Sequence, residues 1–249
     1  MIFVRAVELH RDRVTSFDVY PFNLPVVRGL GRLEFRSAVT VFVGENGTGK
    51  STLLEALAVA AGFNPEGGSR NLAFGTRASH SELHAYLRLV RAPSRPRDGY
   101  FLRAESFFNV ATQIEELDKV PALAPPIIAS YGGRSLHEQS HGESFLTLLQ
   151  ERFWGSGLYL LDEPEAALSP TRQLAALARM HQLVEAGSQF ILATHSPILM
   201  AYPGAQLLGL SDTGIVPLEY DQTEHVAVMR HFMNDRESLL AELLREDDA

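Results

Sequence analysis

The stretch that decides the fold reads Gly44-Glu45-Asn46-Gly47-Thr48-Gly49-Lys50-Ser51. It matches the phosphate-binding pattern G-x-x-x-x-G-K-[ST] at every fixed position. The apolar run 38–43 before it predicts a buried strand, and Leu53, Leu54 and Leu57 after it recur at helical spacing. Strand, glycine loop and helix, in this order, are the context in which the pattern holds a phosphate chain. We call residues 44–51 the P-loop.

Each part of the P-loop has a chemical task. Its glycines let backbone N–H groups wrap a phosphate chain, and the helix that follows adds its positive N-terminal end. Lys50 would supply a charge to the β- and γ-phosphates, and Ser51 would offer a hydroxyl to Mg²⁺. The alternative is a glycine-rich turn that merely caps a core helix. The predicted nucleotide contacts are Gly44, Glu45, Asn46, Gly47, Thr48, Gly49, Lys50, Ser51 and Thr52.

The composition limits the class of protein. The chain has 249 residues, 45% of them hydrophobic, which is enough for one large α/β domain. It has no cysteine, which excludes disulfides and thiolate metal sites. No apolar run approaches the roughly 18 residues of a membrane span, and the charged N-terminus lacks a signal-peptide core. We therefore expect a cytoplasmic protein without a membrane span, folded as a single domain over residues 1–249.

Two further apolar runs, 157–161 and 189–193, predict buried strands that end in polar residues. Asp162 and Glu163 follow the first run, and His195 closes the second. Because strands alternate with predicted helices, we expect a mostly parallel sheet with crossover connections. The carboxyl ends of such strands meet at one edge, so these side chains should lie beside the P-loop.

The chemistry of these three side chains fits a nucleotide site. Asp162 would bind Mg²⁺ together with Ser51, directly or through water. Glu163 would position or deprotonate the water that attacks the γ-phosphate. His195 would donate a hydrogen bond to the same phosphate. The alternative is that the two acids form an ordinary solvated strand end and that the histidine is a structural cap.

Turn residues and hydrophobic periodicity outline the other elements. The predicted elements are strands and turns over 3–35, a hairpin of 85–90 with 100–103, helices over 107–119, 141–153 and 170–186, a hairpin over 205–220 that turns at 212–214, and helices near 224–234 and 236–246.

The tract His137-Glu138-Gln139-Ser140-His141 matches H-E-x-x-H, the zinc-protease pattern. A zinc site would need both histidines on one face of a helix, with a third ligand downstream. A capping box formed by Ser140 and Glu143 opposes this interpretation, because His137 would then lie outside the helix. The helix N-terminus that Ser140 and Gly142 open would instead be an anion site.

The charge pattern gives one hint of a further partner. The net charge is −8, so the chain has no overall basic footprint for nucleic acid. Five arginines nevertheless gather in the tract 88–103 and could contact phosphates. The alternative is a solvated hairpin tip in a protein that prefers arginine to lysine. The five are Arg88, Arg91, Arg95, Arg97 and Arg103.

Taken together, the motifs resemble those of ABC-type ATPases. The matching segments are 44–51 for Walker A, 158–163 for Walker B, 165–169 for the D-loop and 194–195 for the switch-histidine strand. The P-loop sequence and the tract Thr194-His195-Ser196-Pro197 look like the chromosome-maintenance, recombination-repair and phage-defence branch. Within it, the chain is most similar to small stand-alone bacterial ATPases described as AAA-family proteins.

Two parts of the family pattern are altered here. Ser140-His141-Gly142-Glu143 stands where the family carries its L-S-G-G-Q signature. It keeps the serine and the second glycine, but has His141 and Glu143 in place of glycine and glutamine. The family's Q-loop glutamine is not visible, because the strand at 100–104 runs into Glu105.

The resemblance implies an α/β P-loop NTPase fold, the ABC-type ATPase head. Such a head has a mostly parallel central sheet, an N-terminal antiparallel layer and here a short helical insertion at about 107–153. It implies hydrolysis of ATP with Mg²⁺, coupled to ATP-dependent homodimerisation in which Ser140, Gly142 and Glu143 cap the partner's γ-phosphate. The cycle would serve DNA repair, chromosome maintenance or defence, with DNA or a DNA-processing protein as partner.

Two other functions use the same loop. The ATP-binding subunit of an ABC transporter is the main alternative, although such subunits usually carry serine at the position of Asn46 and Thr-His-Asp at the switch. A P-loop kinase would need an acceptor site for the phosphate. Only about 35 residues separate Glu105 from Ser140, which leaves no room for a long coiled-coil arm.

Overall fold

The computed structural model describes residues 1–70, 81–120 and 125–244. The strands are β1 (Val4–Leu9), β2 (Arg32–Glu34), β3 (Val39–Val43), β4 (Gly68–Ser69), β5 (Leu87–Arg91), β6 (Asp98–Arg103), β7 (Gly157–Asp162), β8 (Gln189–Ala193), β9 (Gln206–Ser211) and β10 (Gly214–Leu218). The α-helices are α1 (Pro25–Arg28), α2 (Lys50–Ala61), α3 (Phe107–Asp118), α4 (His141–Thr147), α5 (Pro170–Glu185), α6 (Pro197–Met200), α7 (Glu224–Asn234) and α8 (Arg236–Leu243). Short 3₁₀ segments are η1 (Arg11–Arg13), η2 (Glu82–Tyr86), η3 (Ile127–Tyr131), η4 (Leu136–Glu138), η6 (Pro164–Ala167) and η7 (Tyr220–Gln222), and η5 (Leu148–Arg152) is a π-helix.

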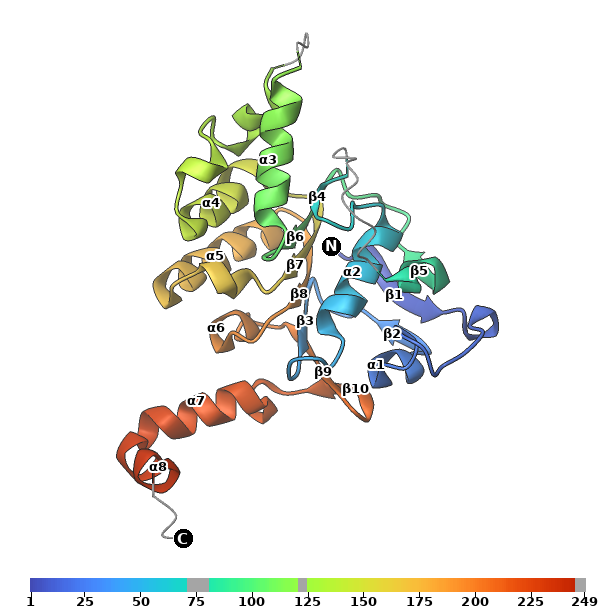
Figure 1. Cartoon of the computed structure of the whole chain (residues 1–249), viewed down its shortest axis with the longest axis vertical. Coiled ribbons are helices and arrows are strands. Elements are labelled where there is room, and N and C mark those ends of the chain that lie inside the picture. The colour runs from blue at the N-terminus through green and yellow to red at the C-terminus, as the bar shows by residue number, and fades with distance from the viewer. Residues whose placement is uncertain (71–80, 121–124, 245–249) are drawn as a thin grey trace.

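Within the described residues, the strands form a large central sheet and a small antiparallel one (Figure 1). The central sheet has the order β10-β9-β3-β8-β7-β6-β4. Neighbours from β9 to β6 run parallel, whereas the edge strands β10 and β4 run antiparallel. The small sheet has the order β2-β1-β5. The predicted parallel sheet with an N-terminal antiparallel layer is therefore confirmed.

The central sheet separates two hydrophobic cores. Helix α2 and the small antiparallel sheet cover one face, and helices α3 to α6 cover the other (Figure 1). Strand β7 shows the alternation that makes this possible, since Leu158 and Leu160 enter the first core and Tyr159 and Leu161 enter the second. Because β7 is buried on both faces, its sequence is a continuous apolar run.

A buried amide anchors the small sheet to the large one. Gln189, at the start of β8, is fully buried. Its Oε1 accepts hydrogen bonds from the backbone N–H of Phe3 at 2.8 Å and of Val4 at 2.9 Å. Its Nε2 donates to Val4 O at 2.9 Å. This polar side chain is buried without penalty because its amide is well paired.

The predicted hairpin of 85–90 with 100–103 is wrong. Strand β5 pairs with β1 in the small sheet, whereas β6 pairs with β7 and β4 in the central sheet. Their burial explains the difference. Strand β6 buries Tyr100 and Leu102 in one core and Phe101 in the other, as an interior strand requires. Strand β5 leaves Arg88 exposed and lies at an edge, so the residues between the strands cross from one sheet to the other.

The other predicted elements match the structure closely. The insertion between β6 and β7 contains α3, η3, η4, α4 and η5. The helix expected over 141–153 is α4 continued by the π-helix η5. The hairpin expected over 205–220 is β9–β10. Part of the last predicted helix, residues 245 and 246, lies outside the described residues.

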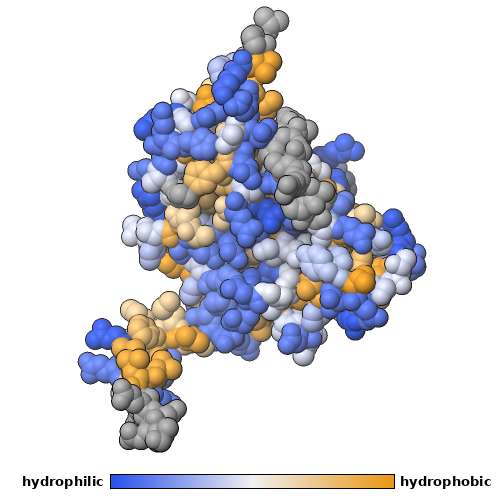
Figure 2. Space-filling model, viewed as in Figure 1, coloured by the Kyte–Doolittle hydropathy of each residue, from blue (hydrophilic) through white to orange (hydrophobic). Residues whose placement is uncertain are grey.

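Helices α7 and α8, which we call the C-terminal arm, project away from the rest of the molecule (Figure 1). Figure 2 shows apolar side chains gathered on this arm. Val228, Met229, Met233 and Leu243 are all more than half exposed there. None of the helices in the described part of the chain combines the length and apolar composition needed to cross a bilayer.

Candidate functional site

Two glycines of the P-loop are required by its shape. Gly44 has φ 154°, and a Cβ there would lie 2.3 Å from Leu210 O in β9. Gly49, at the N-cap of α2, has φ 95°, and a Cβ there would lie 2.8 Å from a Val26 methyl group. Both positions therefore exclude other residues. Between them, Glu45, Asn46 and Gly47 form an exposed tip.

Lys50 lies under this loop. Its ammonium group donates to Gly44 O at 2.7 Å and to Glu45 O at 2.9 Å. The residue is 4% exposed, and burial lowers the pKa of its ammonium group while Glu163 and Asp162 raise it. A cation held by two carbonyl groups at a glycine loop is placed to bind an anion that enters the loop.

Ser51 and Asp162 meet at the carboxyl edge of the central sheet. The Ser51 hydroxyl donates to Asp162 Oδ1 at 2.9 Å. Asp162 is 6% exposed, and burial raises its pKa to about 6 although the Ser51 hydrogen bond opposes the shift. A buried carboxylate beside a hydroxyl offers the hard oxygen ligands that Mg²⁺ prefers. The residues therefore fit the expected magnesium site.

Arg103 is a further member of this edge. It ends β6 opposite Asp162, with its Nε 3.9 Å from Asp162 Oδ2. Its Nη1 donates to Glu55 Oε2 at 2.6 Å, and both partners are largely buried. In the sequence, Arg103 stands out only as part of a basic tract. Its position at the end of a buried strand was the signal that could have placed it here.

Glu163 follows Asp162 in a strained backbone conformation. Its φ of 48° and ψ of 50° lie in the left-handed region, which glutamate adopts at a cost of about 1 kcal/mol. This conformation turns the chain sharply after β7. The Glu163 side chain is 43% exposed, and its Oε1 lies 3.8 Å from His195 Nε2. The predicted acid and the predicted histidine are thus side by side.

His195 is held from two directions. Glu165, in the D-loop segment, accepts from the Thr194 hydroxyl at 2.6 Å and from the His195 backbone N–H at 2.5 Å. The imidazole Nδ1 lies 2.8 Å from Nε2 of His225, in the first turn of α7. Burial lowers the pKa of His195, and the nearby Lys50 adds to this effect. Sequence reasoning missed the roles of Glu165 and His225, because only the fold brings them to this strand end.

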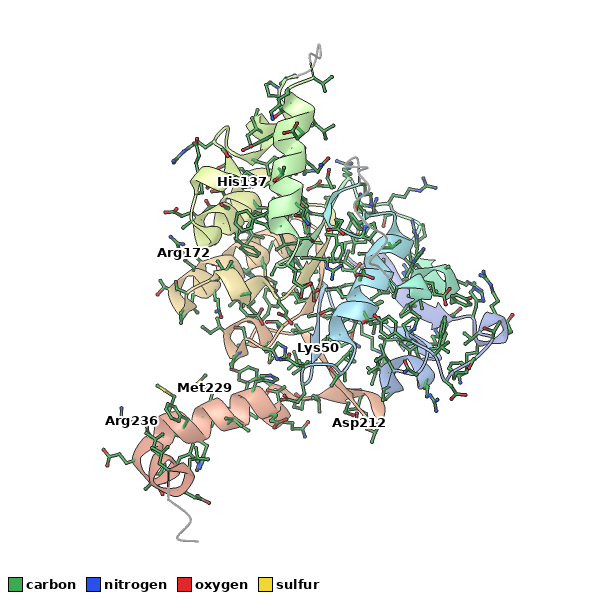
Figure 3. The ribbon with its side chains drawn as sticks, viewed as in Figure 1. Lys50, His137, Arg172, Asp212, Met229 and Arg236 are labelled. Carbon is green, nitrogen blue, oxygen red and sulfur yellow. The ribbon has the colours of Figure 1, made fainter. Side chains whose placement is uncertain are left out.

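The signature-like tract lies on a different part of the molecule. Ser140 caps α4 in a capping box, in which Glu143 Oε2 accepts from the Ser140 backbone N–H at 3.0 Å and from its hydroxyl at 2.8 Å. A Cβ on Gly142 would lie 2.7 Å from Ala167 O. Arg172, in α5, lies 3.6 Å from the Glu143 carboxylate. Figure 3 shows Arg172 well separated from Lys50.

The zinc-protease interpretation fails on geometry. His137 lies in η4, and the extended residues Gln139 and Ser140 separate it from α4. The His137 ring stacks on Phe108 of α3, with 5.6 Å between ring centroids, and lies beside that helix (Figure 3). In the ranges that the structure describes, no group of three His, Asp or Glu side chains could hold a metal ion.

The predicted arginine patch is not one surface. Arg103 belongs to the Asp162 edge, and Arg88 lies 3.8 Å from the Glu8 carboxylate in the small sheet. Arg91 and Arg95 instead line a depression of about 420 Å³ together with Arg70. This depression also includes Leu158, at the start of β7, and so lies away from the carboxyl edge that carries the P-loop.

An open depression of about 600 Å³ adjoins the P-loop. Its walls come from the P-loop tip, the β9–β10 hairpin and the start of α7, including His225. Tyr20 lies on another side of the same loop, 60% exposed, with its hydroxyl 3.3 Å from Thr52 Oγ1. An exposed aromatic ring beside a phosphate loop can stack on a nucleotide base. Tyr20 is therefore the candidate base-contacting residue that the structure adds.

Two family models match the chain. One, described as an AAA domain, covers residues 24–106 and includes the P-loop. The other, described as "AAA domain, putative AbiEii toxin, Type IV TA system", covers residues 140–201 and includes the signature-like tract, Asp162, Glu163 and His195. The chain is a P-loop ATPase of the AAA/ABC type. The description of the second model agrees with the resemblance to the defence-like branch.

Solved structures resemble this ATPase along most of its length. The ATP-binding cassette MJ1267 of an ABC transporter has a TM-score of 0.53 at 14% identity, covering 96% of this chain and 98% of its own. The cbiO1 protein of Clostridium perfringens, part of the ABC transporter complex cbiONQ, has a TM-score of 0.50 at 16% identity, covering 98% and 99%. The SMC head domain of Thermotoga maritima has a TM-score of 0.43 at 18% identity, covering 88% and 100%. No curated protein matches the chain.

Proposed function

We propose that the ATPase hydrolyses Mg²⁺–ATP in composite sites, each built from the P-loop edge of one copy and the signature-like helix of a second. The separation of Lys50 from Arg172 within one chain carries this proposal (Figure 3). The P-loop edge holds the charge for the phosphates, while the N-terminus of α4 lies elsewhere. A second copy, related by a two-fold axis, could bring its α4 over the first copy's phosphates.

In this proposal the P-loop edge performs the hydrolysis. Lys50 leaves its two carbonyl partners for the β- and γ-phosphates, and Tyr20 stacks on the base. Ser51 and Asp162 hold Mg²⁺, which neutralises phosphate charge when bound. Glu163 orients the attacking water, and His195 donates from Nε2 to the γ-phosphate.

The capping box determines how the second copy would engage. The Ser140 amide and hydroxyl are both used by Glu143, so a phosphate can bind them only when Glu143 turns away. Arg172, 3.6 Å from the Glu143 carboxylate, is placed to hold it in the displaced position. This explains how an acidic residue is tolerated where the resembling family carries glutamine.

A mixing experiment tests the composite site. Lys50→Ala disables the P-loop, and Ser140→Arg blocks the cap, so each homodimer should be inactive. After free subunit exchange at equal concentrations, half of the dimers are mixed and each has one intact site, so about one quarter of wild-type activity should return. Confirmed exchange without recovered activity would contradict the proposal. Thermal unfolding of each variant shows whether it is folded.

A second proposal concerns what the ATP cycle acts on. We propose that the depression lined by Arg70, Arg91 and Arg95 binds the phosphate backbone of DNA. None of the described residues that line it is acidic. Burial lowers the pKa of Arg70, and the positive charge of the neighbouring Arg91 lowers it further. The depression therefore holds positive charges close together. DNA would fit a role in repair, chromosome maintenance or defence.

Salt dependence tests the DNA proposal. Duplex binding should weaken steeply between 50 and 200 mM salt, because each neutralised phosphate releases counterions. Replacing Arg91 and Arg95 by alanine should lower the salt slope by about 2. Arg88→Ala is the matched control, since Arg88 faces Glu8 outside the depression. Equal binding by the double variant and the control would contradict this proposal, as would a wild-type protein that binds no DNA. An ABC transporter subunit would instead copurify with a membrane protein.

A further inference from the structure

The two imidazoles at the switch strand share one hydrogen bond. His195 follows β8, and His225 stands in the first turn of α7. Nδ1 of His195 and Nε2 of His225 are 2.8 Å apart, with the ring planes inclined by 59°. His195 has its backbone fixed independently by Glu165, so the ring is the part that His225 orients.

The outer nitrogens of this pair are buried without a hydrogen-bond partner among the described residues. They are Nε2 of His195 and Nδ1 of His225. Nε2 of His195 lies 3.8 Å from Glu163 Oε1, which is beyond hydrogen-bond distance. The only hydrogen bond that either ring makes within the described chain is therefore the one between them.

Only one proton can lie between two neutral imidazoles. If His195 donates, its Nε2 presents a lone pair to the Glu163 carboxylate, and the two repel each other. If His225 donates, Nε2 of His195 carries the proton and presents N–H to that carboxylate. The second arrangement is electrostatically favoured. Burial lowers the pKa of His195, which favours the neutral ring in which the choice between the two tautomers arises.

We propose that His225 is a positioning residue that holds His195 in the Nε2–H tautomer. The hydrogen bond from His225 Nε2 occupies His195 Nδ1, so the His195 proton faces the phosphate site. This inference rests on the proposed contact between His195 and the γ-phosphate for its catalytic consequence. The tautomer itself does not depend on that contact. Because His225 belongs to α7, the hydrogen bond also joins the phosphate site to the C-terminal arm.

Substitutions at position 225 separate donation from simple packing. His225→Gln places an amide N–H₂ near the position of the imidazole Nε2 and can still donate. His225→Glu offers only acceptor oxygens when ionised, so it should draw the His195 proton to Nδ1. His231→Gln is the matched control, because His231 is an exposed histidine on the same helix. Thermal unfolding of each full-length variant verifies that it is folded.

The direct readout is the ¹⁵N NMR tautomer of His195 at pH 8, assigned by its absence from His195→Ala. We expect Nε2–H in the wild type, in His225→Gln and in the control, and Nδ1–H in His225→Glu. ATP turnover should stay within about threefold for His225→Gln and fall at least about tenfold for His225→Glu.

Two results would overturn the inference. One is an Nδ1–H tautomer of His195 in the wild type. The other is an unchanged His195 tautomer in His225→Glu. Failure of the proposed function would look different. In that case the tautomers follow the prediction but His195→Ala hydrolyses ATP at the wild-type rate. That result would reject the proposed contact between His195 and the γ-phosphate and leave the tautomer assignment intact.

Discussion

The Ser51 hydroxyl donates a 2.9 Å hydrogen bond to Asp162 Oδ1, across 111 residues of sequence. Ser51 begins the helix that follows β3 and the P-loop, and Asp162 ends β7; these two strands are not neighbours in the sheet, because β8 lies between them. The P-loop turns the chain so that α2 begins over this gap and carries Ser51 to the Asp162 side. The P-loop thus brings together the two residues that we propose as Mg²⁺ ligands, beside the backbone that we propose binds the phosphates.

Removing the Asp162 charge should make the folded protein more stable but abolish its ATPase activity. Burial raises the pKa of Asp162 from 3.8 to about 6, so the folded state holds the proton more tightly than the unfolded state. The ionised carboxylate therefore opposes folding above pH 6, and this penalty disappears as the pH falls below 3.8. Asp162→Asn should raise the free energy of unfolding of the nucleotide-free protein by up to about 3 kcal/mol at pH 7.5.

Thermal unfolding at two pH values checks this prediction. The gain from Asp162→Asn should be clear at pH 7.5 and nearly absent at pH 4, while Mg²⁺-dependent ATPase activity is lost. Asp12→Asn, in the exposed segment η1, is the control and should change neither quantity. If Asp162→Asn is less stable than the wild type at pH 7.5, burial of the ionised Asp162 carboxylate does not destabilise the folded state.

Glu163 is expected to activate water without contributing to ATP binding. Its carboxylate is exposed toward solvent beside His195, so its loss should leave the P-loop contacts intact. Glu163→Gln should keep the dissociation constant for ATP but lower the turnover number by about 10²–10⁴-fold. Equilibrium binding and steady-state hydrolysis measure the two quantities. Near-normal turnover in Glu163→Gln would show that another group activates the attacking water.

Glu165 should hold the switch strand in place. Its carboxylate accepts from the Thr194 hydroxyl and from the His195 backbone N–H, both in charge-assisted bonds. Glu165→Ala leaves both donors unpaired and should lower the free energy of unfolding by about 2–3 kcal/mol. Glu165→Gln, which keeps one acceptor, should lose less. Denaturant unfolding measures both, and an alanine variant as stable as the wild type would remove Glu165 from this role.

Gly142 should be required for packing α4 on the D-loop segment. A Cβ there would meet Ala167 O at 2.7 Å and Arg172 Nη1 at 2.4 Å, and the carbonyl cannot move as freely as the side chain. Gly142→Ala should therefore cost about 1–3 kcal/mol of unfolding free energy. Gly31→Ala is the control, because no atom lies within 4 Å of the added Cβ. Equal stability of the two variants would show that α4 can move away from Ala167 O without loss of unfolding free energy.

Local patterns predicted most of the fold. The P-loop, the apolar runs of β7 and β8, and the cap at Ser140 each depend on neighbours within a few residues. The structure has these elements close to the predicted bounds. The order of motifs along the chain then gave the parallel sheet, because crossover connections follow from alternating strands and helices.

Long-range pairing was the part that local patterns could not give. Strand β5 and β6 follow each other in sequence, yet their partners β1 and β7 lie far away along the chain. Arg103 was grouped with nearby arginines for the same reason, although its charge faces Glu55 and Asp162. His225 carries no motif, and only the turn from β10 into α7 brings it to His195.

The sedimentation velocity of Glu163→Gln with and without Mg²⁺–ATP tests the central claim most directly. This variant should trap ATP unhydrolysed, so a composite site predicts a monomer without nucleotide and a dimer with it. The double variant Lys50→Ala, Glu163→Gln should remain monomeric in both conditions, because its P-loop cannot hold the phosphates. If Glu163→Gln binds ATP at saturation and still sediments as a monomer, the active site is not shared between two chains.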